Sequence, residues 1–155
     1  MSGNPVLVQV VGPSGSGKTW LIERLIPRLA QRELRIGTIK HAHDAFDVDQ
    51  PGKDSWRYAQ AGAQMVALVG PRRTAYLTTT AAETTLDEAV RRIADHLDVI
   101  LVEGFHRIKL PRIQLAHGAN AHVLVEDTEC RIGVQPDELS EDELERVTQF
   151  VIRNA

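Results

Sequence analysis

Residues 12–19 are Gly12-Pro13-Ser14-Gly15-Ser16-Gly17-Lys18-Thr19, which match the phosphate-loop (Walker A) pattern G-x-x-x-x-G-K-[ST] at every fixed position. The run at 6–11 before them is apolar and rich in valine, which is typical of a strand buried in a parallel sheet. From Thr19 onward, apolar residues recur with the helical period as far as Leu29. A strand, a glycine-rich loop and a helix in this order predict an α/β fold that binds nucleotide phosphates.

The composition excludes several classes of protein. The chain has 155 residues, with 18 Lys and Arg against 21 Asp and Glu, and its net charge of −3 offers no overall basic field to nucleic acid or to an anionic membrane. A single cysteine, Cys130, cannot form an intramolecular disulfide, which fits a reducing compartment. The apolar run at 6–11 is too short to span a bilayer. We therefore expect a soluble cytoplasmic protein that contacts neither nucleic acid nor membrane.

Patterns along the rest of the chain predict one domain over residues 1–155. Helical periods predict helices that begin near residues 19, 54, 85 and 140. Apolar runs predict strands at 35–40, 65–69, 74–77, 99–102, 113–115 and 122–125, of which 65–69 and 74–77 form a hairpin. Together they predict a three-layer, P-loop NTPase-like α/β domain with a largely parallel sheet and a hairpin extension.

The phosphate loop supplies the first candidate site residues. Its backbone N–H groups converge on phosphate oxygens, Lys18 is a cation for the β- and γ-phosphates, and the Thr19 hydroxyl can ligate Mg²⁺. Such a loop also needs an acidic partner near the metal, and Glu103 follows the apolar run at 99–102. We expect Lys18 and Glu103 to be catalytic residues, and Thr19, Glu103 and Asp49 to be metal ligands.

The segment after the second predicted strand is rich in side chains that bind ligands: Lys40, His41, His43, Asp44, Asp47 and Asp49. Three interpretations are open, namely a nucleotide-responsive switch, a transition-metal site of histidine and carboxylate, and a solvated polar loop. We favour a switch or substrate loop, because two histidines without a nearby cysteine are a weak set of transition-metal ligands.

Two basic segments are further candidates for anion binding. A basic cluster follows Glu103 and consists of His106, Arg107, Lys109 and Arg112, which predicts an anion-binding or partner-binding surface. Arg72 and Arg73 lie in the predicted hairpin, where they either grip an anion or keep the hairpin soluble.

Three segments are distinctive together: Gly12 to Thr19, the stretch from Thr38-Ile39-Lys40-His41-Ala42-His43 through Phe46-Asp47-Val48-Asp49 to Ala61-Gly62-Ala63, and Leu101-Val102-Glu103-Gly104-Phe105. They resemble the MobB family, the adaptor proteins of molybdopterin-guanine dinucleotide biosynthesis, over about residues 5–116. The resemblance implies a homodimeric, weakly hydrolysing GTP-binding protein that uses Mg²⁺. It also implies two kinds of partner, a molybdopterin guanylyltransferase and molybdoenzymes.

By position, the resemblance implies that residues 12–19 hold the phosphates and that Glu103 is the acidic strand-end residue. It also implies that Lys40 and His41 begin a signature loop that continues through His43 and Asp47. Asp44 stands where the family often has a second histidine, which weakens a metal site built on a histidine pair.

Two other functions remain open on the residues alone. The phosphate loop also suits a small-molecule or nucleotide kinase, for which Arg72 and Arg73 are the lid candidates. A metal-delivery GTPase would use His41 and His43. The N-K-x-D element by which many GTPases read guanine is absent, so the choice of GTP over ATP rests on the resemblance.

Overall fold

The computed structural model describes residues 4–42, 48–116, 123–125, 128–133 and 136–155. Contacts divide the chain into two compact units. The core unit comprises residues 1–41 and 86–155, and the hairpin unit comprises residues 42–85. The residues His43 and Asp47 of the expected signature loop lie outside the described residues.

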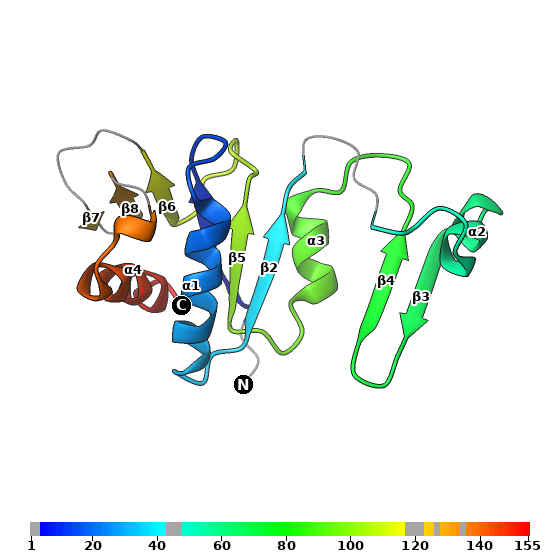
Figure 1. Ribbon diagram of the computed structural model, residues 1–155, viewed down its shortest axis with the longest axis horizontal. Coiled ribbons are helices and arrows are strands. Elements are labelled where there is room, and N and C mark those ends of the chain that lie inside the picture. The colour runs from blue at the N-terminus through cyan, green and yellow to red at the C-terminus, as the bar shows by residue number, and fades with distance from the viewer. Residues whose placement is uncertain (1–3, 43–47, 117–122, 126–127, 134–135) are drawn as a thin grey trace. The chain divides into compact units, whose positions relative to one another are not determined.

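The core unit is built on a six-stranded sheet with the strand order β2-β5-β1-β6-β8-β7 (Figure 1). The neighbours β2-β5, β5-β1, β1-β6 and β6-β8 are parallel, and β7 runs antiparallel to β8. The strands are β1 (Val6–Val11), β2 (Ile36–Lys40), β5 (Val99–Glu103), β6 (Arg112–Leu115), β7 (Val123–Val125) and β8 (Glu129–Ile132). The predicted largely parallel sheet is confirmed, and β8 is a strand that the sequence patterns missed.

Helices cover both faces of this sheet. Helices α1 (Lys18–Ala30) and α4 (Glu141–Arg153) pack with alternate residues of β1, β5, β6 and β8 in the larger core. Helix α3 (Leu86–Ile93) packs on the other face, against Ile100 and Val102 of β5 and Ile39 of β2. A short 3₁₀ helix, Pro136–Glu138, precedes α4. This three-layer arrangement confirms the predicted fold class.

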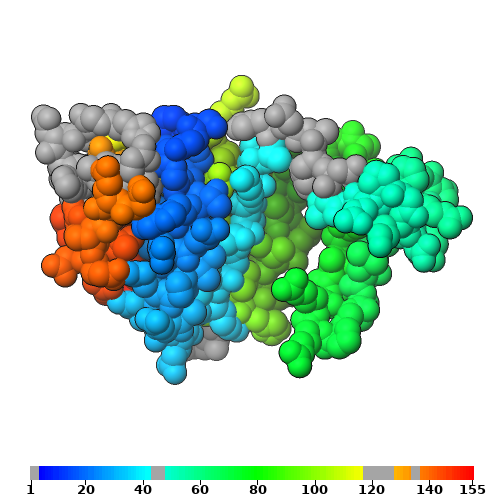
Figure 2. Space-filling model, in the orientation of Figure 1, coloured from blue at the N-terminus to red at the C-terminus, as the bar shows by residue number. Residues whose placement is uncertain are grey.

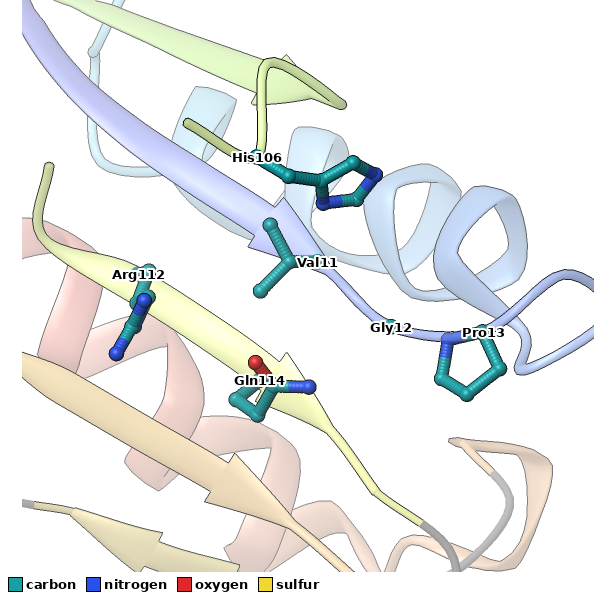
Figure 3. A pocket seen from close by; sticks show the side chains of 6 residues that line it. All are labelled: Val11, Gly12, Pro13, His106, Arg112 and Gln114. Carbon is teal, nitrogen blue, oxygen red and sulfur yellow. The ribbon is translucent and has the colours of Figure 1, made fainter. Parts of the chain in front are cut away.

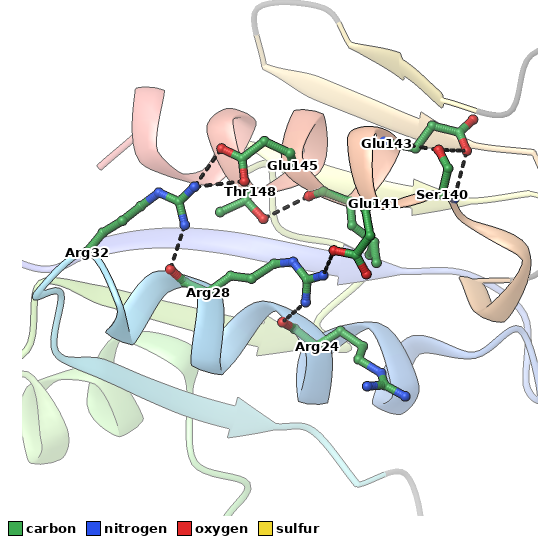
Figure 4. A network of polar contacts seen from close by, with 9 residues as sticks. Arg24, Arg28, Arg32, Ser140, Glu141, Glu143, Glu145 and Thr148 are labelled. Carbon is green, nitrogen blue, oxygen red and sulfur yellow. Dashed lines mark hydrogen bonds and ion pairs between the residues drawn. The ribbon is translucent and has the colours of Figure 1, made fainter.

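Polar contacts join α1 to α4 at the surface (Figure 4). The Arg32 guanidinium contacts the Glu145 carboxylate at 2.6 Å, and Arg28 pairs with Glu141 one turn away. Ser140 begins α4 with a capping box, in which its hydroxyl accepts the Glu143 N–H. Exposed ion pairs contribute only about 0.2–1 kcal/mol each, so the apolar core carries most of this helix packing.

The hairpin unit contains α2 (Asp54–Gln60) and an antiparallel pair, β3 (Met65–Val69) and β4 (Thr74–Thr78). The hairpin predicted from the sequence is therefore confirmed. Large apolar side chains are exposed on its strands, which Figure 2 draws in green, with Val69 at 80% and Tyr76 at 69%. Among the described residues, no helix is long and apolar enough to cross a membrane.

Candidate functional site

The phosphate loop connects β1 directly to α1, as its sequence predicts. Gly15 and Gly17 turn the backbone at φ +74° and +83°, in the left-handed region that glycine adopts without strain. Gly17 is the N-cap of α1, and no side chain caps the helix there. The free N–H groups and the positive end of the helix dipole therefore face the loop, which is the arrangement that binds phosphate.

Close packing holds the first residue of the loop in place. A Cβ on Gly12 would lie 2.7 Å from the Ser16 Oγ and 2.9 Å from the Leu115 Cβ, so only glycine fits. Ser16 is fully buried, and its Oγ has no hydrogen-bond partner in the described part of the chain. Strand β6, which contributes Leu115, is thus part of the support of the loop.

The Lys18 side chain folds back over the loop. Its Nζ donates hydrogen bonds to the carbonyl oxygens of Pro13 at 2.7 Å and Gly12 at 3.1 Å. These two contacts hold the ammonium group against the loop backbone. Thr19, the other side chain expected to contact nucleotide, is exposed on the first turn of α1.

Glu103 lies at the carboxyl end of β5, beside the strand that leads into the loop. It is opposite Val10 of β1 in the sheet register and opposite Lys40 of β2. Strand alternation places it on the face that α1 covers, together with Val99 and Leu101. The Lys40 Nζ lies 3.7 Å from its Oε1, and the Glu103 side chain is only 14% exposed. The fold thus brings Lys40, Glu103 and the phosphate loop to one edge of the sheet.

The turn after Glu103 has two residues with positive φ, and a buried side chain from β1 forms hydrogen bonds to it. Gly104 and Phe105 have φ values of +94° and +53°. The Gln9 side chain, 1% exposed in the middle of β1, donates from Nε2 to the Gly104 oxygen at 2.6 Å and the Phe105 oxygen at 2.9 Å. Sequence analysis missed Gln9, although a polar residue inside the apolar run at 6–11 was a visible signal.

His41 packs on the same turn. Its backbone N–H donates to the backbone carbonyl oxygen of Glu103 at 2.8 Å, and its ring stacks on Phe105 with ring centroids 4.4 Å apart. A Cβ on Gly104 would lie 2.7 Å from the His41 Cβ. The first histidine of the expected signature loop is therefore built into the turn that carries Glu103.

Asp49 lies in the hairpin unit. Its Oδ1 accepts hydrogen bonds from the Gln50 N–H and the Ser55 hydroxyl, both at 2.9 Å, and its Oδ2 is buried without a hydrogen-bond partner among the described residues. The described residues include no group of three or more His, Cys, Asp or Glu side chains placed to hold a metal ion. Metal binding by Asp49 stays a prediction.

The two basic segments lie in different units of the chain. Residues 106, 107 and 109 of the basic cluster are exposed in the connection from β5 to β6, and Arg112 begins β6 beside Glu129 of β8. Arg72 and Arg73 are exposed in the short turn between β3 and β4, which is not a long lid. The basic cluster therefore belongs to the core unit, and the arginine pair belongs to the hairpin unit.

Comparison with known proteins identifies the family. Residues 7–134 match the family model of molybdopterin guanine dinucleotide synthesis protein B, MobB. The chain belongs to the MobB family. The resemblance seen in the sequence motifs is thereby confirmed.

Relatives of this MobB-family chain include two bacterial proteins named molybdopterin-guanine dinucleotide biosynthesis adapter protein. The protein from Haemophilus influenzae is 42% identical over 116 residues, which cover 74% of this chain and 65% of that protein. The protein from Escherichia coli is 43% identical over 112 residues, which cover 70% and 64%. The matches thus span slightly less than two thirds of the length of these relatives.

Solved MobB structures have the same fold. A crystal structure of molybdopterin-guanine biosynthesis protein B superposes with a TM-score of 0.71 at 25% identity, covering 95% of this chain and 97% of that one. The Bacillus subtilis MobB structure gives a TM-score of 0.68 at 21% identity, covering 94% and 98%. At 21% identity, the similarity to the Bacillus subtilis structure supports only the fold.

Proposed function

We propose that this protein is a GTP-binding adaptor in molybdopterin-guanine dinucleotide biosynthesis. The observation that carries the proposal is a fully formed phosphate loop, with Lys18 folded over it, in a chain of the MobB family. The relatives are named as adapter proteins of molybdopterin-guanine dinucleotide biosynthesis, and we take the process from these names. The protein would work in the cytoplasm as a single nucleotide-binding domain, with the hairpin unit as its extension.

Residues 12–19 would bind the β- and γ-phosphates through backbone N–H groups. The Lys18 ammonium would exchange its two carbonyl contacts for phosphate oxygens, which are stronger partners because they are charged. The Thr19 hydroxyl and the Glu103 carboxylate are the hard oxygen donors that Mg²⁺ prefers. Bound magnesium would neutralise part of the phosphate charge. Asp49 is the further candidate metal ligand.

Glu103 would position the metal or its water and would not drive fast hydrolysis. Its carboxylate is already engaged by Lys40, and an arginine finger, worth about 10³–10⁵ in rate, would have to come from a partner. Slow intrinsic GTPase activity follows. Lys40, His41, His43 and Asp47 would form the loop that responds to nucleotide, since His41 contacts the Glu103 turn directly.

The hairpin unit supports a homodimer. A two-stranded sheet needs further packing to be stable in water, and within the hairpin unit the exposed Val69, Tyr76 and Met65 form apolar surface of the kind that marks protein interfaces. Sedimentation of the wild type should give the mass of two chains, and Val69→Lys should shift the equilibrium toward one chain. A wild type that sediments as one chain would exclude the dimer.

The central test is nucleotide binding. Calorimetry should show that Mg·GTP binds to the wild type and that Lys18→Ala weakens binding at least about tenfold, because charged hydrogen bonds to phosphate are lost. Arg24→Ala is the matched control, since it removes an exposed cation from the same helix without touching the loop. ATP competition measures the base preference. Failure of the wild type to bind GTP would overturn the proposal.

The partner is tested separately from the nucleotide. The protein loaded with a non-hydrolysable GTP analogue should retain a molybdopterin guanylyltransferase, or a molybdoenzyme, more strongly than the nucleotide-free protein does. A small-molecule kinase would instead transfer phosphate rapidly to an acceptor in a metabolite screen.

A further inference from the structure

One half of the sheet presents a polar face. On the side opposite α1, the alternating positions of β6 and β8 are Arg112, Gln114, Glu129 and Arg131, whereas Ile113, Leu115, Cys130 and Ile132 face the core. Helix α3 lies on this side but packs against β2, β5 and the start of β1. Three-layer α/β domains normally bury both faces of a parallel sheet, so a charged half-face next to the phosphate loop calls for an explanation.

A pocket of about 260 Å³ lies on this half-face (Figure 3). Its walls come from the first residues of the phosphate loop, from the β5–β6 connection and from β6, and they are Val11, Gly12, Pro13, His106, Arg112 and Gln114. Every lining residue belongs to the core unit. The polar side chains of β6 thus share a hollow with the backbone that begins the phosphate loop.

Among the described residues, cationic side chains predominate around this pocket. Arg112 Nε and Arg131 Nη2 contact the two oxygens of Glu129 at 3.2 and 2.9 Å. The hydrogen bond from Arg131 holds the pKa of the Glu129 carboxyl below its usual range, so this group is an anion at neutral pH. Two guanidinium groups therefore share one carboxylate. Among the described residues, Arg107 and Lys109 in the adjoining connection add two further cations, in a chain whose net charge is −3.

We propose that this pocket binds a phosphate monoester, as a second anion beside the nucleotide held by the loop. Arg112 contacts Glu129 through its Nε, and its terminal nitrogens make no hydrogen bond within the described part of the chain. They can therefore form the paired hydrogen bonds that guanidinium makes with phosphate. Its side chain is 43% exposed and accessible from solvent. The Gln114 Nε2 donates one hydrogen bond to the Leu115 carbonyl oxygen at 3.1 Å, and its second N–H can donate to a phosphate.

The assignment of the ligand rests on the proposed function. A dinucleotide of molybdopterin and guanine joins two phosphate-bearing halves, so the molybdopterin half must present a phosphate monoester. The pocket is smaller than those that usually enclose a whole cofactor, and its volume suits a phosphate group with the carbon atoms next to it. Gly12 and Pro13 line the pocket and are also the first residues of the phosphate loop. The two phosphate groups would therefore lie on either side of the same short backbone segment.

The test is a titration with 6-hydroxymethylpterin monophosphate, in the presence and absence of a saturating non-hydrolysable GTP analogue with Mg²⁺. The wild type should bind this pterin phosphate in both conditions and should bind unphosphorylated 6-hydroxymethylpterin far more weakly. Arg112→Gln should weaken binding about 10- to 100-fold, the loss typical of charged hydrogen bonds, and should leave the affinity for the GTP analogue within about twofold. Gln114→Leu should give a smaller loss and serves as the second variant if Arg112→Gln folds poorly.

Arg35→Gln is the matched control. Arg35 is also an exposed arginine paired with a carboxylate, Asp98, but it lies at the opposite end of the sheet, before β2. Equal losses in Arg35→Gln and Arg112→Gln would mean general charge attraction and would overturn the pocket assignment. Normal binding of the GTP analogue without binding of the pterin phosphate would overturn this inference and leave the proposed function standing. Binding of the pterin phosphate that depends on Arg112, without GTP binding, would overturn the proposed function only.

Discussion

Replacing Gln9 with leucine should destabilise the protein and weaken its magnesium-dependent binding of nucleotide. Gln9→Leu keeps the approximate size of the side chain but removes both hydrogen bonds to the turn after Glu103. The loss of a partner for the buried Gly104 oxygen costs about 1–3 kcal/mol, and loss of the bond to the partly buried Phe105 oxygen costs about 0.5–1.5 kcal/mol.

Leucine recovers part of this cost, about 1 kcal/mol, through burial of extra apolar surface. The net loss in the free energy of unfolding is about 0.5–3.5 kcal/mol, which corresponds to a decrease of roughly 1–14 °C in Tm for a domain of this size. Since the freed turn begins directly after Glu103, the affinity for Mg·GTP should fall severalfold, while binding of GTP without Mg²⁺ should change little.

Urea unfolding gives the stability, and calorimetry with and without Mg²⁺ gives the affinities. Thr148→Val is the matched control, because Thr148 is equally buried and its hydroxyl donates to a backbone oxygen, that of Leu144, at 2.8 Å. It should reduce stability without changing nucleotide affinity. If Gln9→Leu unfolded at the wild-type urea concentration and bound Mg·GTP normally, the anchoring role of Gln9 would be refuted.

Three further predictions concern the stability of the fold and the reactivity of its cysteine. Gly104→Ala should destabilise the protein by at least about 1–2 kcal/mol in urea unfolding, because φ is +94° there and the new Cβ would lie 2.7 Å from the His41 Cβ. The hydrogen bond from Arg35 lowers the pKa of Asp98 from 3.8 to about 2, so its stabilisation is complete above the unfolded value and is lost as the pH falls toward 2. The stability difference between wild type and Asp98→Asn should shrink over that interval and stay constant near neutral pH. Burial raises the pKa of the Cys130 thiol to about 12, so Ellman's reagent should react slowly with the native protein and rapidly in denaturant.

Local sequence was enough for the elements whose pattern is strong. The six-residue β1, the glycine loop and the start of α1 are consecutive, so their motif carries both their identity and their contacts. The capping box of Ser140 and Glu143 likewise fixed the start of α4, since the two reciprocal hydrogen bonds lie within four residues. By contrast, β8 alternates charged Glu129 and Arg131 with Cys130 and Ile132, which is the pattern of a half-buried strand, but it is only four residues long and is too short for that pattern to stand out.

The sequence by itself determined the phosphate loop, the fold class and the family, because glycine spacing and apolar periods act over a few neighbouring residues. Only the tertiary structure decided that Gln9 anchors a turn 95 residues away, that His41 packs on Phe105, and that Arg112 and Gln114 share a pocket with the phosphate loop. The physical reason is strand order. β1 lies between β5 and β6, so residues distant in sequence meet at one edge of the sheet, and no local pattern records which strands are neighbours.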